Sequence, residues 1–240
     1  MLKPWQKRSW CLPEVSGEFV WRMEDVLGLY AAPYDPRRPT VGFDEVSKEL
    51  HGEVNPPLPA RPGDVARQDY EYTREGTANL FLIVEPLTGL RHLTVTERRT
   101  RIDFAHQMRY LCDELYPEAE VIRVVLDNLN THGPASLYEA FPPEEARRLT
   151  ERLEFHYTPK HASWLNVAEL ELSVLARQCL NRRIATREEL ARVVAAWEAE
   201  RNAVRAKIVW SFRVAEARVK LAKLYPVGPE ETSRTPVSDH

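Results

Sequence analysis

The stretch "VVLDNLNTHG" (124–133) joins an apolar, β-branched run to an abrupt polar turn. Val124, Val125 and Leu126 have the composition of a buried strand, and Asp127 ends it. Ligands of α/β sheets commonly bind near strand ends, so an acid at this place is a candidate site residue. The alternative is a carboxylate that only caps the strand or the following turn.

On both sides of this stretch, apolar periodicity predicts alternating strands and helices. Strands are expected at 40–50, 79–89, 91–99, 120–129 and 153–159, with 79–89 and 91–99 as antiparallel neighbours joined around "PLTG". Helices are expected at 13–31, 101–116, 134–152 with a break at Pro142–Pro143, 164–181, 187–204 and 214–224. Thr186 and Glu189 are expected to form a capping box. This order of elements predicts an α/β fold with a mixed sheet flanked by helices.

Length and composition indicate a globular protein with one main domain. The chain has 240 residues, of which 43% are hydrophobic and 29% charged, and this length allows one sizeable core. The three cysteines are far apart and odd in number, which fits neither a disulfide framework nor a zinc site. No apolar run approaches membrane length and the N-terminus lacks a signal-peptide pattern, so we expect a cytoplasmic protein.

Charge is distributed unevenly along the chain. The net charge of −3 argues mildly against a nucleic-acid partner, because phosphate binding needs clustered lysine and arginine. Residues 177–223, the basic region, nevertheless hold twelve basic and five acidic side chains, a local charge of +7. This region is either a DNA-facing surface or the ordinary solvated side of helices.

Two further acids stand at positions that predict a site. Asp44 lies in "VGFDE" on the expected strand 40–50. On the expected helix 164–181, Glu169 is four residues after Leu165 and three before Leu172, which predicts that it faces the core, with Glu171 about 200° away from it. A carboxylate on an inner face needs a partner or a metal ion, and a buried arginine or a backbone donor is the alternative to the metal.

Together these acids have the chemistry of a two-metal site. Mg²⁺ and Mn²⁺ prefer carboxylate oxygens to imidazole or thiolate ligands. Two such ions about 3.5–4 Å apart can activate an attacking water or 3′-hydroxyl and stabilise the leaving oxygen of a phosphodiester. The sequence has no Gly-rich phosphate loop, GxSxG, HExxH or CxxC pair that would favour another chemistry.

The blocks "GFDE", "VVLDNLNTH" and "FHYTPKHASWLNVAELELSVL" resemble the three signature blocks of bacterial insertion-sequence transposases of the mariner superfamily, the DDE endonucleases. The resemblance runs from about Lys3 to Tyr225. It implies a ribonuclease-H-like fold and two Mg²⁺ or Mn²⁺ ions as cofactors. It also implies cutting of DNA at the ends of a mobile element and transfer of the 3′-hydroxyl ends to target DNA, typically at a TA dinucleotide. By this resemblance Asp44, Asp127 and Glu169 are the catalytic acids and the metal ligands.

The resemblance assigns supporting roles to other residues. Asn128 and His132 match polar positions near the phosphate or the metal-bound water, and a hydrogen bond that stabilises the turn is the alternative for His132. Asn166 is expected to cap the helix that bears Glu169 or to contact a metal ligand, and Trp164 to anchor that helix by packing. The expected DNA contacts are Lys160, His161, Arg182 and Arg183.

The resemblance also predicts how the chain is divided. We expect residues 1–38 to be a helical linker, the remnant after a missing helix-turn-helix region that family members usually carry. Residues 39–205 would be the catalytic domain, 206–226 a helical C-terminal extension and 227–240 a disordered tail. The 41 residues between Asp127 and Glu169 exceed the common spacing in the family, and the broken helix 134–152 accounts for the excess.

The expected partners are the DNA of the element's ends and of the target, and a second transposase subunit, either an identical one or a full-length transposase. Two other interpretations stay open. The chain could be a catalytically silent DNA-binding or regulatory protein that pairs with a full-length transposase. It could also be another ribonuclease-H-like nuclease, acting on RNA–DNA hybrids or junctions.

Overall fold

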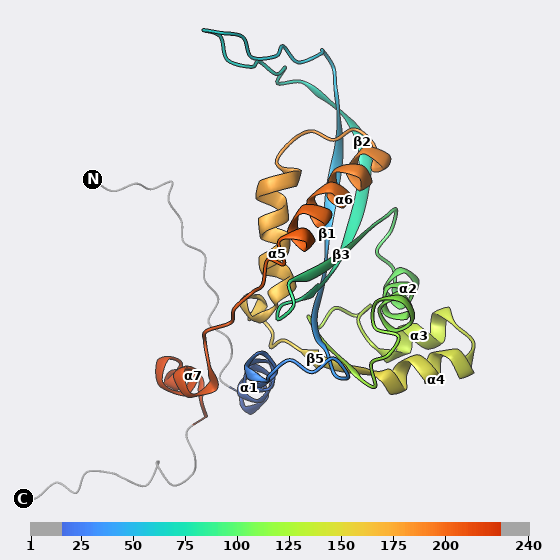
Figure 1. Ribbon diagram of the computed structural model, residues 1–240, viewed down its shortest axis with the longest axis vertical. Helices are drawn as coiled ribbons and strands as arrows, with labels where there is room; N and C mark the ends of the chain where they lie inside the picture. The colour runs from blue at the N-terminus through green and yellow to red at the C-terminus, as the bar shows by residue number, and fades with distance from the viewer. Residues whose placement is uncertain (1–15, 227–240) are drawn as a thin grey trace, which may run out of the picture.

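A computed structural model describes residues 16–226, and a five-stranded mixed sheet forms their centre (Figure 1). The strands are β1 (Thr40–Glu53), β2 (Tyr72–Glu85), β3 (Leu90–Thr96), β4 (Ile122–Leu126) and β5 (Leu153–Tyr157). Their order is β3-β2-β1-β4-β5; the pairs β3–β2 and β2–β1 are antiparallel, and the pairs β1–β4 and β4–β5 are parallel. The predicted mixed sheet is thereby confirmed.

Seven α-helices accompany the sheet in the described residues. They are α1 (Gly17–Ala31), α2 (Arg101–Tyr110), α3 (Pro134–Ala140), α4 (Pro143–Arg152), α5 (Val167–Leu175), α6 (Arg187–Ala203) and α7 (Val214–Lys220). Short helical turns are η1 (Leu111–Leu115), η2 (Ser163–Leu165), η3 (Ala176–Leu180) and η4 (Ala222–Leu224). The predicted break between α3 and α4 is confirmed. Among the described helices, none is long and apolar enough to cross a membrane. The predicted tail at 227–240 and the first part of the predicted linker lie outside the described residues.

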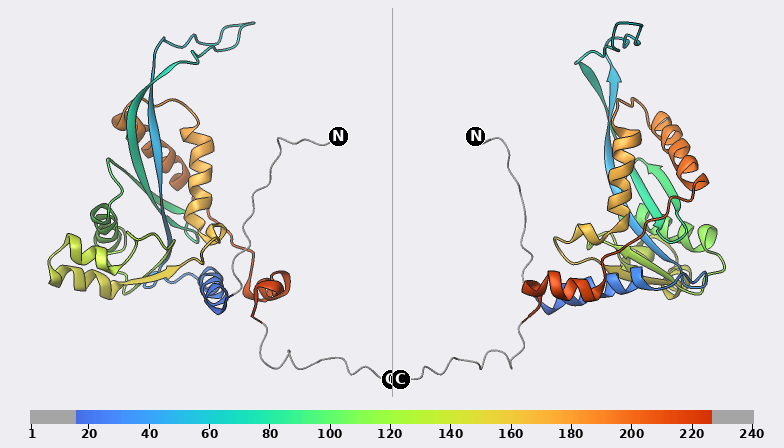
Figure 2. Two further views of the ribbon diagram at one scale, coloured as in Figure 1. Left: turned by 180° about the vertical axis from the view of Figure 1, so that it is seen from behind. Right: turned by 60° about the vertical axis from the view of Figure 1, so that its left-hand side comes forward.

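Two hydrophobic clusters cover the two faces of the sheet, because side chains alternate along each strand. On β2, Leu80, Leu82 and Val84 pack in the cluster that includes buried residues of α1, α5 and α6. Phe81 and Ile83 pack on the other face, with buried residues of α2, α3 and α4. Figure 2 shows the sheet between α5 on one side and α2 to α4 on the other. The acids of the candidate site belong to the α5 side.

The hairpin of β1 and β2 reaches further outward than the predicted strands 40–50 and 79–89, because β1 ends at Glu53 and β2 begins at Tyr72. Its outer part contains a register shift between Glu49 and His51, and residues 54–71 continue it as a projecting arm (Figure 1). The outer residues of β2 are exposed, so their sequence lacks the apolar alternation that would have indicated a strand.

Helix α6 begins as its sequence predicts, with one difference. The side chain of Thr186 accepts a hydrogen bond from the backbone N–H of Glu189, which confirms the predicted N-cap. The carboxylate of Glu189 accepts from the N–H of Ala185 instead of that of Thr186. The reciprocal half of the predicted capping box is therefore replaced by a contact one residue earlier.

Candidate active site

The register of β1 against β4 places Asp44 beside Asp127. Gly42 is the partner of Val125 in this parallel pair, and each acid follows two residues later on its own chain segment. Residues two apart on a strand point to the same face. Val125 belongs to the cluster on the α5 side, so both acids point toward the face that α5 covers.

Gly42 lets the first turn of α5 approach β1 very closely. A Cβ atom at this position would lie 2.5 Å from Cγ2 of Val167 and 3.1 Å from the backbone nitrogen of Ala168. Only glycine leaves room for this approach without a shift of the helix. Glu169 is the next residue along α5, so the same contact brings it to the strand that carries Asp44.

Asn166 links the start of α5 to the strand. Its Oδ1 atom accepts a hydrogen bond from the N–H of Ala168 at 3.0 Å, which confirms the predicted cap. Its Nδ2 group donates to the carbonyl oxygen of Phe43 at 3.1 Å and to Oδ2 of Asp44 at 3.3 Å. A single buried amide therefore holds both the helix that bears Glu169 and the carboxylate of Asp44.

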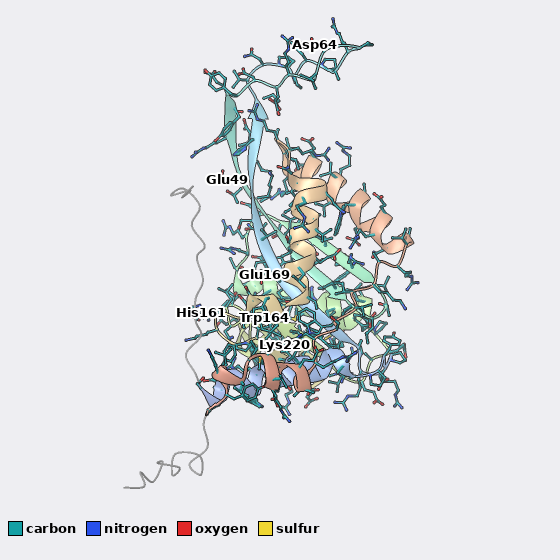
Figure 3. All side chains as sticks on the ribbon, turned by 90° about the vertical axis from the view of Figure 1, so that its left-hand side faces the viewer. Glu49, Asp64, His161, Trp164, Glu169 and Lys220 are labelled. Carbon is teal, nitrogen blue, oxygen red and sulfur yellow. The ribbon has the colours of Figure 1, made fainter. Side chains whose placement is uncertain are left out.

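Helix α1 and the C-terminal segment support the same turn from outside. The hydroxyl of Tyr30 donates to the carbonyl of Leu165 at 2.8 Å and accepts from the N–H of Val167 at 3.3 Å. The ring of Trp164 stacks on that of Trp210 with their centroids 6.4 Å apart, so the predicted packing role is confirmed. Trp164 is still 41% exposed, on the molecular face that also carries Glu169 (Figure 3).

The three predicted acids lie close enough to repel one another. Burial raises the pKa of Asp44 to about 7, and the negative charges of Glu45, Asp127 and Glu169 add to this rise against the hydrogen bond from the N–H of Glu45. In residues 16–226 neither Asp44 nor Glu169 forms an ion pair with a lysine, arginine or histidine. The site is an accumulation of negative charge that the described part of the chain leaves largely uncompensated.

Within residues 16–226, Asp127 accepts hydrogen bonds through one of its two oxygens. Its Oδ1 atom accepts from Nδ1 of His132 at 2.6 Å and from the N–H of Leu129 at 3.1 Å. Burial would raise the pKa of Asp127, but the hydrogen bond and the charge of His132, with the N–H of Leu129, lower it. For His132 the effects have opposite signs. Burial alone would lower its pKa, but the carboxylates of Asp127 and Glu45 raise it to about 9.

His132 is buried, and its place near a phosphate or a metal-bound water stays a prediction. Its ring lies against Phe43 and Phe104, and its Nε2 atom is 2.9 Å from Oε2 of Glu45. The bond to Asp127 corresponds to the alternative, a contact that stabilises the turn. Glu45 was missed, although strand alternation places it on the apolar face with Phe43, where a carboxylate needs a partner.

Asn128 contacts two neighbouring parts of the chain. Its Nδ2 group donates to the carbonyl of Thr158 at 2.5 Å, and its Oδ1 atom accepts from the guanidinium of Arg22 on α1. The side chain thus joins the loop after β4 to the end of β5 and to α1. No sequence signal had pointed to Arg22.

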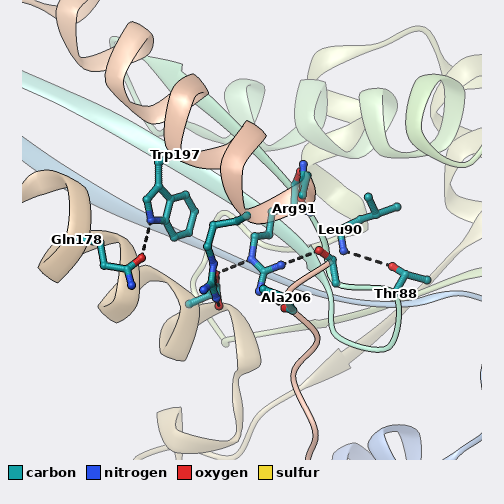
Figure 4. Close-up of polar contacts among 10 residues, drawn as sticks. Thr88, Leu90, Arg91, Gln178, Trp197 and Ala206 are labelled. Carbon is teal, nitrogen blue, oxygen red and sulfur yellow. Dashed lines mark hydrogen bonds and ion pairs between the residues drawn. The ribbon is translucent and has the colours of Figure 1, made fainter. Parts of the chain in front are cut away.

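The predicted orientation of α5 is wrong in one respect. Glu169 is exposed, whereas Glu171 is only 2% exposed and binds two arginines. Arg91 on β3 donates to Glu171 at 2.5 Å, and Arg201 on α6 donates to it at 2.9 Å. Figure 4 shows Arg91 and its further contact with the carbonyl of Ala206. Helix α5 is buried on two sides, against the sheet and against α6, and a single apolar stripe does not reveal the second side.

The residues predicted to contact DNA differ in exposure and in whether their side chains are already bound within the chain. Lys160 and His161 are exposed in the turn after β5, where His161 adopts a left-handed conformation with φ of 63°. Arg182 is also exposed. The guanidinium of Arg183 donates to Glu53 and to backbone carbonyls of the arm at residues 69 and 71, so it already ties the arm to the turn before α6.

The donor set of the site fits hard divalent cations. Mg²⁺ is usually bound by one or two carboxylates together with waters and substrate phosphates, not by a cage of protein ligands. As the side chains stand, no group of three or more His, Cys, Asp or Glu residues within 16–226 could hold an ion by itself. The negative charge around Asp44 nevertheless matches ions whose coordination is completed by water or phosphate oxygens.

Comparison with known proteins agrees with this geometry. The sequence profile of the DDE superfamily endonucleases matches residues 39–191. A Mos1 transposase paired-end complex with the left transposon end superposes with a TM-score of 0.53 at 15% identity, over 88% of this chain and 69% of that one. A Mos1 mariner paired-end complex with Mn gives 0.54 at 14% identity, over 93% and 66%. The Mos1 strand transfer complex gives 0.54 at 15% identity, over 91% and 62%.

These likenesses confirm the predicted ribonuclease-H-like fold. The chain spans roughly two thirds of the length of the Mos1 chains. No curated protein sequence matches it significantly. Because the sequence profile covers more than half of the residues, this chain belongs to the DDE superfamily of endonucleases.

Proposed function

We propose that the chain is the catalytic domain of a transposase, which cuts DNA at the ends of a mobile element and joins the 3′-hydroxyl ends to target DNA. The observation that supports this proposal is the convergence of Asp44, Asp127 and Glu169, of which only Asp127 has a cationic partner, His132, among the described residues. A protein that only binds DNA gains nothing from such a cluster, because DNA is itself an anion and repels it. The cluster therefore favours catalysis over the binding or regulatory alternative.

The proposed ligands of Mg²⁺ or Mn²⁺ are the carboxylates of Asp44, Asp127 and Glu169. The chemistry that two bound ions supply is activation of the attacking water or 3′-hydroxyl and stabilisation of the leaving oxygen. The protein's part is to hold the carboxylates: Asn166 orients Asp44, and His132 orients Asp127. Two of the similar structures are Mos1 paired-end complexes with Mn and with Mg, which supports this choice of ions.

The proposed DNA contacts lie near the acids or in the basic region. Lys160 and His161 are exposed in the turn that leads to α5, and Arg182 and Arg183 lie at the end of η3. Part of the basic region is engaged within the chain, since Arg201 binds Glu171 and Arg218 binds Glu24. The exposed remainder is the part available to phosphates.

One of the similar structures is a Mos1 transposase complex with the left transposon end, which supports DNA as the partner. We propose that two subunits act together, because two element ends must be brought to one target. We further propose that the target is a TA dinucleotide and that residues 39–205 form the catalytic unit. The proposed location is the cytoplasm.

The experiment that tests this proposal is a cutting assay with the purified chain. The substrate is a supercoiled plasmid that carries the inverted repeats flanking the gene, incubated with Mn²⁺. We expect nicking that depends on Mn²⁺ and disappears in Asp127→Asn, because that variant loses a carboxylate and keeps the size of the side chain. Oligonucleotide RNA–DNA hybrids in parallel reactions test the other ribonuclease-H-like activity.

Asp113→Asn is the matched control, because Asp113 forms an ion pair with Arg148 away from the candidate site. Nicking by the control should equal that of the unmodified chain. Equal nicking by Asp127→Asn would assign the activity to a contaminant and end the proposal.

A further inference from the structure

The apolar face of the sheet opposite α5 contains a buried pair of charged residues. The side chain of His132 is 1% exposed and that of Glu45 is 4% exposed, and the atoms Nε2 and Oε2 lie 2.9 Å apart. Their surroundings are aromatic, with the rings of Phe43 and Phe104 about the imidazole. In the described residues the only other ion-pair partner of Glu45 is Arg99, whose Nη1 atom lies 3.7 Å from Oε1.

A buried ion pair of this kind is a poor way to stabilise a fold. The loss of hydration of two charges offsets most of their attraction, and apolar side chains of similar volume often stabilise a protein equally well or better. Packing alone therefore does not explain why an apolar face carries Glu45 and His132. Their position relative to Asp127 offers an explanation.

His132 reaches from this pair to the candidate site. Its Nδ1 atom contacts Oδ1 of Asp127 at 2.6 Å, and the N–H of Leu129 donates to the same oxygen. Among the described residues no hydrogen bond to Oδ2 of Asp127 is formed. Asp127 is thus fixed by one oxygen, with the other left for a cation, and side chains that hold a ligand in this way commonly tune metal affinity.

We propose that Glu45 is a positioning residue of the metal site: it fixes the imidazole of His132 from behind, and His132 fixes the carboxylate of Asp127 with Oδ2 directed to the cation. This inference rests on the proposed function. It assigns different tasks to two adjacent acids of β1. Asp44 faces the cation on one side of the sheet, and Glu45 acts from the other side through His132.

The test is Mn²⁺ binding by the full chain, measured from the electron paramagnetic resonance signal of free Mn²⁺, together with the melting temperature. We expect Glu45→Gln to weaken Mn²⁺ binding about 10-fold or more, as loss of a group that orients a ligand does in known metal sites. Nicking by this variant should need a correspondingly higher Mn²⁺ concentration. A purely structural role predicts a lower melting temperature with unchanged Mn²⁺ binding, and that result would overturn the inference.

Glu49→Gln is the matched control. Glu49 lies on the same strand and also pairs with a histidine, His51, at 3.2 Å, but its side chain is 66% exposed. Figure 3 shows Glu49 well separated from Glu169 along the molecule. This variant should bind Mn²⁺ as the unmodified chain does, which separates the effect of Glu45 from the loss of any Glu–His contact.

A second set of variants tests the route through His132 and covers the case in which Glu45→Gln does not fold. The apolar pair E45L/H132L should fold, because it replaces both charges together. It should bind Mn²⁺ as weakly as His132→Leu alone, since residues that act in series do not give additive losses. A further loss in the double variant would show that Glu45 acts independently of His132, against the inference.

The two levels of the proposal fail in different ways. If the unmodified chain binds Mn²⁺ and nicks DNA, but Glu45→Gln does both equally well, the positioning role is wrong and the proposed function stands. If the unmodified chain neither binds Mn²⁺ nor nicks DNA, the proposed function is wrong and the positioning role falls with it.

Discussion

Two carboxylates on α5, two residues apart, have opposite surroundings. Glu171 is buried between Arg91 and Arg201, so the chain supplies its countercharges. Glu169 lies close enough to Asp44 for its charge to raise the pKa of that carboxyl, and it forms no ion pair in the described residues. The first cluster is complete within the folded protein, whereas the second gathers like charges.

The comparison teaches how to separate a structural acid from a functional one. Burial alone would have selected Glu171, because it is by far the less exposed of the two. The absence of a countercharge points to Glu169. Like charges that the fold holds close together raise the free energy of the folded protein unless a cation binds between them. The first two predictions below alter one cluster at a time, and each of these two should affect only one of function and stability.

The largest effect is expected for the acid without a countercharge. Glu169→Gln should reduce Mn²⁺-dependent nicking about 1,000-fold or more, since metal-ion stabilisation of the transition state is worth several kcal/mol. Its melting temperature should stay that of the unmodified chain, because Glu169 is exposed. The measurement is nicking rate beside thermal unfolding, with exposed Glu188→Gln as control. Retention of full nicking by Glu169→Gln would remove this acid from the site.

The reverse pattern is expected for the acid with countercharges. Glu171→Ala leaves Arg91 buried without its carboxylate and should destabilise the protein by about 3–5 kcal/mol. Thermal unfolding should then show a melting temperature lower by about 10 °C, at 2–4 °C per kcal/mol for a chain of this size. Glu169→Ala serves as the comparison and should change stability little. Equal stability of the two variants would mean that the arginine cluster does not support α5.

A smaller effect is expected from the glycine that brings α5 to β1. Gly42→Ala places a Cβ atom 2.5 Å from a side-chain atom of Val167 and 3.1 Å from the backbone of Ala168. Moving α5 away should cost about 1–3 kcal/mol by overpacking and should also lower nicking, because Glu169 moves with the helix. Urea unfolding measures the first and plasmid nicking the second.

Gly28→Ala is the control for that substitution. Gly28 lies in α1 with open space around its Cα atom. Alanine there should stabilise the protein by about 0.5–1 kcal/mol, because it lowers the entropy cost of forming the helix. A destabilised Gly28→Ala or an unaffected Gly42→Ala would contradict the close contact.

The smallest effect concerns pH. The pKa of Asp44 is raised from 3.8 to about 7 in the folded protein, so between these values the folded state keeps a proton that the unfolded state has released. Stability therefore falls as pH rises through this window. Asp44→Asn removes this contribution. In EDTA, the melting temperature of the variant minus that of the unmodified chain should therefore rise by a few degrees as pH increases from 4 to 7.

His132 contributes in a separate window. Its pKa is raised from 6.5 to about 9 in the fold, so its stabilisation is complete below pH 6.5 and is lost as pH rises through 9. Both chains of the preceding experiment contain His132. A difference between them that grows only above pH 7 would therefore contradict the assignment to Asp44.

Much of the architecture could be predicted because it depends on residues that are near one another in the sequence. The apolar runs around Val124 and Phe81 indicated strands, and the stop at Pro142–Pro143 indicated two helices, since burial repeats every two residues in a strand and every three to four in a helix. Asn166 could be predicted as a cap for the same reason, because its partner Ala168 is two residues away. The outer part of β2, where both faces are exposed, differs in its boundary for a physical reason, because exposed strands lack apolar alternation.

The sequence by itself thus determined the order of strands and helices, the placement of acids after apolar strands and the family resemblance, all of which depend on near neighbours. Only the tertiary structure decided which acid of α5 is neutralised, that Glu45 meets His132, and that Arg183 is tied to the arm. Those outcomes depend on partners many residues away, such as Arg91 for Glu171. The charge around a carboxylate is a property of the assembled fold, and local periodicity carries no record of it.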